Sequence, residues 1–255
     1  VKSCGDAQAR LAPGCSIDCL HCGSCRDIFA RIPIEPTIWQ KLSLPWQSDV
    51  IRTRLLIDHG GLWMDATVYP NCDVQSWMTG HLQAGVFFFS RPGRDRAVSN
   101  WMIAAEPGNV LLQRLFDRLC EFWNTTDFSN YSGRPAGFQA LVARALNRNL
   151  QAPRLWVKAW FAQRFPTPAY MVYHYMVYDL IRTDRAVRAI WERMPKISAE
   201  PCIRLQRLGL LNPLTKEAKR LIDKPDAPVF KLTWKLPNDE IPPGSILDYL
   251  FTRHA

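Results

Sequence analysis

Apolar residues recur along this chain at two spacings, and each spacing predicts one kind of regular structure. A period near 3.6 residues predicts helices, whereas alternation or a short apolar run predicts strands. Helices are expected at about 1–12, 48–59, 109–124, 137–149 and 168–194, and strands at about 15–20, 62–68, 85–90 and 229–235. Because the two kinds are intermixed, without a linker or an internal repeat, the pattern predicts one α/β domain with helical insertions.

Capping and turn residues set the expected limits of the helix at 48–59. Ser48 is suited to cap its start, with Asp49 in the first turn, and Gly60 and Gly61 would end it before the next strand. The preceding passage, 31–46, contains three prolines, each of which interrupts a hydrogen-bonded ladder. We therefore expect 31–46 to be irregular.

The net charge favours an anionic partner. The 255 residues include 32 Lys and Arg against 23 Asp and Glu, a formal charge of +9, which suits a nucleotide, an anionic lipid surface or a nucleic acid. The basic residues are spread along the chain without a nucleic-acid motif, which argues against nucleic acid. The apolar runs at 85–90 and 171–181 are shorter than the roughly 18 residues of a membrane span, so we expect a soluble or peripheral protein.

The start of the chain carries most of its cysteines and allows several interpretations. The spacing C-x3-C-x2-C-x2-C is compatible with a metal or iron–sulfur site, with disulfides, or with cysteines that serve only as small apolar residues of a strand; its members are Cys15, Cys19, Cys22 and Cys25. No secretory signal is visible, which favours reduced thiols in the cytoplasm. Since the sequence opens with Val1 inside a predicted helix, we expect an opening strand to be missing.

The residues that suggest chemistry gather between 48 and 70. Asp49 and Arg52 are three apart on a predicted helix, so a carboxylate and a guanidinium emerge side by side and can grip a polyhydroxylated ligand. Asp65 and Thr67 alternate on a predicted strand, so both oxygens face one point. A hard cation such as Mg²⁺ or Mn²⁺ bound to a diphosphate needs little more from the protein than such oxygens.

This segment, S-D-x-x-R followed by an apolar helix, G-G, an aromatic residue and D-A-T, resembles the sugar-nucleotide signature of glycosyltransferase family 32 and its capsular-polysaccharide-synthesis relatives. It is also similar to the matching segment of the clostridial glucosylating toxins. Further segments at 99–123, 170–180 and 229–235 resemble later parts of the capsule-synthesis proteins. The resemblance implies a GT-A-like nucleotide-diphospho-sugar transferase fold with a central mixed sheet, a nucleotide-sugar-binding half at 1–95 and a helical, acceptor-side half at 96–255.

The resemblance also implies roles for individual residues. Asp49 and Arg52 would hold the donor sugar, and Asp65 would be the first acid of the D-x-D motif. Thr67 stands where the motif has its second acid, so most ligation of a Mn²⁺ or Mg²⁺ ion would come from the diphosphate and water. In the closing strand, Thr233 and Trp234 would donate hydrogen bonds near the leaving diphosphate.

Three further residues have open interpretations. Lys231 and Lys235 could neutralise the diphosphate without any metal. His174 lies in an aromatic helix, where a hydrogen-bonded core histidine and an acceptor-side catalytic residue are both conceivable.

Together these observations favour a glycosyltransferase that moves a sugar, with retention of configuration, from a nucleoside-diphosphate donor such as a UDP-sugar to a glycan or other hydroxyl acceptor. We expect it in the cytoplasm, peripheral at the inner face of a membrane, or in the Golgi lumen of a eukaryote. The alternatives are a non-catalytic sugar-nucleotide or carbohydrate-binding module, and a metal or iron–sulfur enzyme built on the cysteine cluster.

Overall fold

The chain is divided into two compact units in the computed structural model, which describes residues 8, 16–18, 26–128, 137–165, 169–233, 235 and 240–252. Unit 1 comprises Val1–Asp18, Met64–His81 and Ser198–Ala255, and unit 2 comprises Cys19–Trp63 and Leu82–Ile197. Each unit takes segments from both of the halves expected at 1–95 and 96–255. That the whole chain acts as one functional domain stays a prediction.

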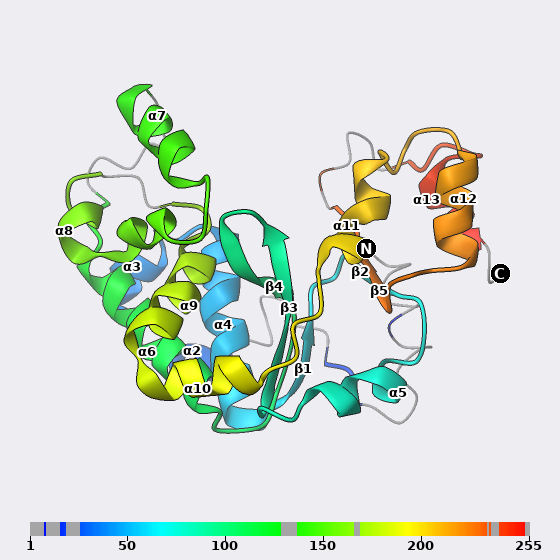
Figure 1. Ribbon diagram of the computed structural model, residues 1–255. Helices are drawn as coiled ribbons and strands as arrows, with labels where there is room; N and C mark the ends of the chain where they lie inside the picture. Colours follow the sequence, from blue (N-terminus) through cyan, green and yellow to red (C-terminus); the bar gives the residue numbers. More distant parts are fainter. Residues whose placement is uncertain are drawn as a thin grey trace. The chain divides into compact units, whose positions relative to one another are not determined.

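A three-stranded sheet crosses unit 2 (Figure 1). Its strands, in spatial order, are β1 (Gly61–Met64), β4 (Arg96–Ala105) and β3 (Val86–Gly93). β3 and β4 run antiparallel, with Val86 opposite Ala105. The apolar run at 85–90 is thus confirmed as a strand, whereas β4 was not expected, because its sequence mixes polar residues such as Ser99 and Asn100 with apolar ones.

Helices pack on this sheet and on one another. α4 and α9 contact β4, and α6 contacts both α4 and α9 (Figure 1). The helices of unit 2 are α2 (Arg26–Phe29), α3 (Pro36–Trp39), α4 (Leu44–His59), α6 (Val110–Thr125), α7 (Gly137–Leu146), η2 (Ala152–Val157), α8 (Ala159–Ala162), α9 (Val172–Thr183) and α10 (Arg185–Arg193). Their buried residues form one apolar core that includes Val50, Leu115 and Val177.

The passage at 31–46 is more regular than predicted. Pro36 and Pro45 lie in the first turns of α3 and α4, where proline is favoured because its missing N–H would have no helical partner. α4 therefore begins at Leu44, with Ser43 and not Ser48 at the N-cap position. Asp49 consequently lies inside the helix and not in its first turn.

The long helix expected at 168–194 is two helices. α9 ends at Thr183, and the side chain of Asp184 accepts hydrogen bonds from the backbone N–H groups of Ala186 and Val187 at the start of α10. An aspartate in this position satisfies two N–H groups that have no partner within the helix. The chain is therefore divided into two helices at Asp184, although the apolar periodicity continues across this residue.

Unit 1 is built on a two-stranded antiparallel sheet of β2 (Val68–Pro70) and β5 (Val229–Lys231). Its helices are α5 (Val74–Met78), η1 (Thr79–His81), α11 (Glu200–Arg207), α12 (Lys216–Asp223) and α13 (Ile246–Thr252). Tyr69 and Phe230, which lie opposite each other in the sheet, are buried in a second apolar core with Leu205 and Leu250.

The described part of the chain is mixed α/β, as predicted, with many helices and two small sheets. A central mixed sheet of the GT-A type stays a prediction. The single strand expected at 62–68 is broken by a turn, so that β1 joins one sheet and β2 the other. No described helix is long and apolar enough to cross a membrane. The helix expected at 1–12 lies outside the described residues except at Gln8, which is helical, and 16–18, within the strand expected at 15–20, have no regular structure.

Candidate functional site

Asp65 and Thr67 lie in a tight turn and not on a strand. β1 ends at Met64, and the N–H of Val68, the first residue of β2, donates to the Asp65 carbonyl at 2.9 Å. The prediction that the two side chains share a face because a strand alternates is therefore wrong. They converge nonetheless, through the curvature of the turn.

The point on which they converge is the ammonium group of Lys231. Nζ of Lys231 donates to Oδ2 of Asp65 at 3.1 Å and also to Oγ1 of Thr67. The side chains of Asp65 and Lys231 are 27% and 17% exposed, so the ion pair is partly buried yet in reach of solvent. Two oxygens of one turn thus hold one cationic nitrogen.

Strand pairing brings these distant segments together. In the β2–β5 ladder Val68 lies opposite Lys231, and the Leu232 N–H donates to the Thr67 carbonyl at 2.8 Å. The turn and the end of β5 are therefore joined by main-chain hydrogen bonds as well as by side chains. The closing strand is shorter than the expected 229–235, since β5 ends at Lys231.

Thr233 and Lys235, beyond the end of β5, are joined by a hydrogen bond. The hydroxyl of Thr233 accepts a hydrogen bond from the Lys235 N–H at 3.0 Å. Thr233 is half-buried and Lys235 is exposed. Trp234, the other predicted donor to the diphosphate, lies outside the described residues.

Gln8 is a member of this cluster that sequence reasoning missed. Its Nε2 donates to the carbonyls of Asp65 at 3.2 Å and Val68 at 2.9 Å. Gln8 therefore clamps both ends of the turn that carries Asp65 and Thr67. A single glutamine gives no sequence signal for such a role.

A second cluster, in unit 2, contains Asp49 and Arg52. Both lie inside α4 and are only 5% and 4% exposed, and their side chains form an ion pair at 3.6 Å. The prediction that they stand side by side is confirmed, but their expected place near the helix N-terminus is wrong because α4 begins at Leu44.

Arg52 is held from several directions. Its Nε donates to the Ser48 carbonyl at 3.1 Å and its Nη2 to the Ser48 hydroxyl at 2.8 Å, while Nη1 donates to the Asn100 carbonyl. The Asn100 amide in turn donates to Asp49 Oδ1 at 2.8 Å, and the guanidinium carbon lies 5.1 Å from the centroid of the Trp63 ring. The cluster therefore ties α4 to β4 and to β1, the strand that leads into Asp65.

His174 is a buried residue of α9. Burial, together with the nearby guanidinium groups of Arg96 and Arg52, lowers the pKa of its imidazole well below the ordinary value of 6.5. Its Nδ1 has no hydrogen-bond partner among the residues that the structure describes. His174 is therefore a neutral core histidine, while its acceptor-side role stays a prediction.

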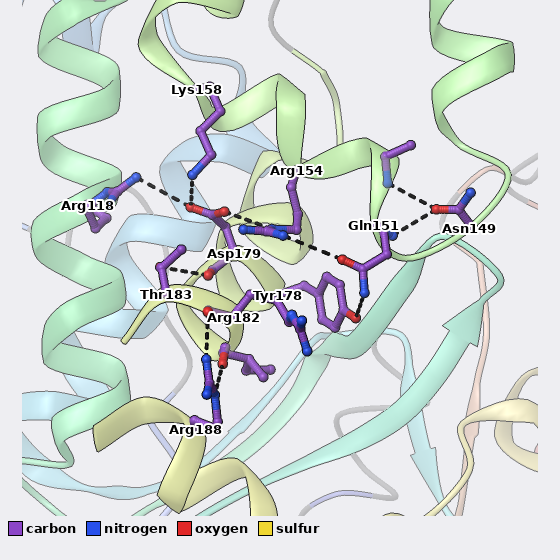
Figure 2. A network of polar contacts seen from close by, with 12 residues as sticks. Arg118, Asn149, Gln151, Arg154, Lys158, Tyr178, Asp179, Arg182, Thr183 and Arg188 are labelled. Atoms are coloured by element: carbon purple, nitrogen blue, oxygen red, sulfur yellow. Dashed lines mark hydrogen bonds and ion pairs between the residues drawn. The ribbon is translucent and has the colours of Figure 1, made fainter. Parts of the chain in front are cut away.

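A further polar network, also absent from the sequence predictions, surrounds Asp179 (Figure 2). Its fully buried carboxylate accepts from Arg154 Nε at 2.9 Å and from Lys158 Nζ at 2.8 Å, and Arg118 Nη2 lies 3.7 Å away. Figure 2 shows these three basic side chains pointing at the one carboxylate. Because they come from η2, the start of α8, and α6, Asp179 ties three elements to α9.

The cysteine cluster expected to bind a metal is not among the described residues, and those residues contain no larger group of metal ligands. No group of three or more His, Cys, Asp or Glu side chains is assembled there to hold a metal ion. The cluster of Cys15, Cys19, Cys22 and Cys25 lies outside the described residues. Elsewhere, burial raises the pKa of the Cys120 thiol to about 12, which disfavours the thiolate that binds metals.

One comparison with known proteins gives a match. Over residues 1–153 the chain matches the family described as capsular polysaccharide synthesis protein. This range contains the motif at 48–70 and ends before β5 and Lys231. No curated protein and no solved structure matches the chain.

Proposed function

Because the chain belongs to the capsular polysaccharide synthesis protein family, we propose that it transfers a sugar from a nucleoside diphosphate to a hydroxyl group of a saccharide acceptor. The family suggests a role in polysaccharide synthesis, and the sugar-nucleotide signature at 48–70 suggests the reaction. The observation that carries the proposal is the β2–β5 pairing, which joins the Asp65–Thr67 turn to Lys231. We expect a GT-A type of architecture around this site.

The chemistry of sugar transfer matches what this turn offers. As the anomeric C–O bond breaks, negative charge develops on the departing nucleoside diphosphate. Lys231 and the exposed Lys235 supply positive charge at the end of β5, and Thr233 supplies a hydroxyl. In the proposal these groups stabilise the leaving diphosphate, and Asp65 keeps the Lys231 ammonium in place.

The buried cluster in unit 2 supports a positioning role. Arg52 and Asp49 are almost fully covered, and Arg52 contacts the Trp63 ring of β1, so the cluster holds α4 against β1 within unit 2. Direct contact of Asp49 and Arg52 with the donor sugar stays a prediction that derives from the family 32 resemblance.

The stereochemical outcome is part of the proposal. The resemblance implies retention of the anomeric configuration. We assign no described carboxylate the role of a covalent nucleophile. We propose a same-face transfer in which the leaving phosphate accepts the proton of the acceptor hydroxyl. Nuclear magnetic resonance of the first-formed product should show the donor's anomeric configuration, and an inverted anomer would exclude this mechanism.

The residues predicted to hold a divalent cation do not fit one as they stand. Asp65 and Thr67 direct their oxygens at the Lys231 ammonium, and a second cation at the same oxygens would face like charge at short range. No step of the reaction is therefore assigned to a metal at this turn.

Donor binding and turnover test the proposal together. The full-length protein is screened by thermal shift against nucleoside diphosphates and sugar nucleotides, UDP-sugars first, and each ligand that binds is assayed for donor hydrolysis and for transfer to saccharides. We expect both binding and turnover, with turnover lost in Asp65→Asn but kept in Asp117→Asn, a control on the exposed face of α6. Binding without hydrolysis or transfer would instead favour a non-catalytic sugar-nucleotide-binding module.

A further inference from the structure

Lys231 occupies the position that a cation would take at the Asp65–Thr67 turn. Its Nζ donates to Oδ2 of Asp65 at 3.1 Å and to Oγ1 of Thr67, the same two oxygens that would serve as ligands of a hard cation. An ammonium group satisfies these oxygens with N–H donors and one positive charge.

The main-chain position of Lys231 is set by the fold. The main chain at Lys231 is held by the β2–β5 ladder, in which Val68 lies opposite Lys231. The next residue is held as well, because the Leu232 N–H donates to the Thr67 carbonyl. The neighbouring pair, Tyr69 and Phe230, is buried in the core of unit 1. Moving Lys231 away from the turn would therefore require either a change of its side-chain rotamer or the opening of a core strand pair.

The contact at the turn already pairs a negative charge with a positive one. Asp65 contributes one negative charge, Lys231 one positive charge, and Thr67 none. A divalent cation bound to the same oxygens would lie next to the ammonium, and at this partly buried place the repulsion would be screened less than at an open surface. The ammonium and a divalent cation are thus competitors for one pair of ligands.

We propose that Lys231 is the resident cation of the Asp65–Thr67 turn, that it excludes a divalent metal there, and that its ammonium takes the place of the metal in binding the diphosphate. The last step rests on the proposed sugar-transfer function, whereas the exclusion of metal does not. The proposal assigns to Asp65 the task of holding a lysine, in contrast to the metal ligation expected from the sequence.

Titration of the full chain with Mn²⁺ alone, followed by electron paramagnetic resonance, tests the exclusion. Wild-type protein should show no saturable binding below about 1 mM, and Lys231→Met should bind at least about tenfold more tightly through the released carboxylate. The gain should vanish in the double variant Lys231→Met/Asp65→Asn. Lys224→Met removes an exposed lysine of the same unit and should behave as wild type.

Two results of this titration would overturn the proposal. One is saturable Mn²⁺ binding to the wild-type chain that Asp65→Asn abolishes; the other is a folded Lys231→Met that gains no affinity. Urea unfolding of each variant establishes that it is folded. If Lys231→Met does not fold, Lys231→Arg takes its place, and because it keeps a cation at the turn, Asp65-dependent Mn²⁺ binding to it would contradict the proposal.

Binding of UDP in excess EDTA tests whether the Lys231 ammonium takes the place of a metal in binding the diphosphate. The wild type should bind UDP equally well with and without EDTA, and Lys231→Met should lose about tenfold or more in affinity under both conditions. A wild-type affinity that collapses in EDTA would show that a metal and not Lys231 neutralises the diphosphate. If no nucleoside diphosphate binds at all, the proposed function fails, while the Mn²⁺ titration still decides whether Lys231 excludes metal.

Discussion

Nζ of Lys231 lies 3.1 Å from Oδ2 of Asp65, although the two residues are 166 positions apart in the sequence. The contact depends on the register of β2 against β5, which places Lys231 opposite Val68. It joins the motif segment, inside the range that matches the capsular polysaccharide synthesis family, to a strand beyond that range. The proposed diphosphate end of the site is therefore assembled from both parts of the chain.

Replacement of Asp65 by asparagine should separate function from stability. Asn keeps the shape of the side chain but removes the charge that holds Lys231, so we expect turnover of a bound donor to fall by about 100-fold or more. The free energy of unfolding should fall by no more than about 1 kcal/mol, because the ion pair is partly exposed. Steady-state release of nucleoside diphosphate and urea unfolding measure the two effects, with Asp117→Asn as the control. A loss of about 3 kcal/mol would mark Asp65 as structural.

Arg52→Lys should weaken both the fold and the reaction. A lysine cannot reproduce the planar set of hydrogen bonds to Ser48 and Asn100, and the groups left unpaired are buried. We expect a loss of about 2 kcal/mol in the free energy of unfolding. Most of the activity should be lost as well, because the family 32 resemblance assigns Arg52 to the donor sugar. The comparison variant is Arg185→Lys, at an exposed arginine of α10. Wild-type stability and rate in Arg52→Lys would show that the Arg52 guanidinium is not needed for the fold or for the reaction.

His174 should make the fold sensitive to mild acid. Burial and the guanidinium groups of Arg96 and Arg52 keep its pKa well below 6.5 in the folded protein, whereas the unfolded chain takes up the proton near pH 6.5. The unfolded state therefore binds more protons in this window, so the contribution of His174 to stability is complete above about pH 6.5 and falls by up to about 1.4 kcal/mol per pH unit below it.

Urea unfolding at pH 7, 6 and 5 checks this dependence. In His174→Gln the free energy of unfolding should fall less steeply with acidification than in the wild type, while His59→Gln, at an exposed histidine of α4, should leave the wild-type slope unchanged. Equal slopes in the wild type and His174→Gln would contradict the assignment of a neutral buried imidazole.

Asp179→Asn should act on stability alone. Its carboxylate is fully buried and compensates Arg154 and Lys158, with Arg118 at slightly longer range. Removing the charge leaves these cations together without their counterion, at a cost of about 3 kcal/mol in the free energy of unfolding. Urea unfolding against Asp117→Asn measures this loss, and turnover per folded molecule should be unchanged. A loss below about 0.5 kcal/mol would show that the network is not important for stability.

The fold was predictable where one local rule dominates. The aromatic run of β3 and the apolar period of α6 were both found from the sequence. The break between α9 and α10 was missed although Asp184 is a strong capping residue, because the apolar period continues across it. β4 was missed because the polar residues in it look like loop residues, and Asn100 is bound to Asp49 only in the folded chain.

Of the predicted site residues, Asp65, Thr67 and Lys231 lie together in the structure, but their geometry was not predicted. The motif identified Asp65 and Thr67, and the closing segment identified Lys231 and Thr233. Their mutual arrangement depends on strand register, a non-local property that a single sequence does not reveal. Gln8 was missed for a related reason, since its significance arises only from the two carbonyls that it contacts.

The most direct test of the central claim is the rate at which the purified full-length protein releases UDP from a UDP-sugar in the presence of a saccharide acceptor, measured for the wild type, Lys231→Met and Lys224→Met. We predict equal release by the wild type and Lys224→Met, with a glycosylated product visible by mass spectrometry, and a loss of about 100-fold or more in a folded Lys231→Met. Equal rates in the two lysine variants, or no release from any sugar nucleotide by the wild type, would contradict this prediction.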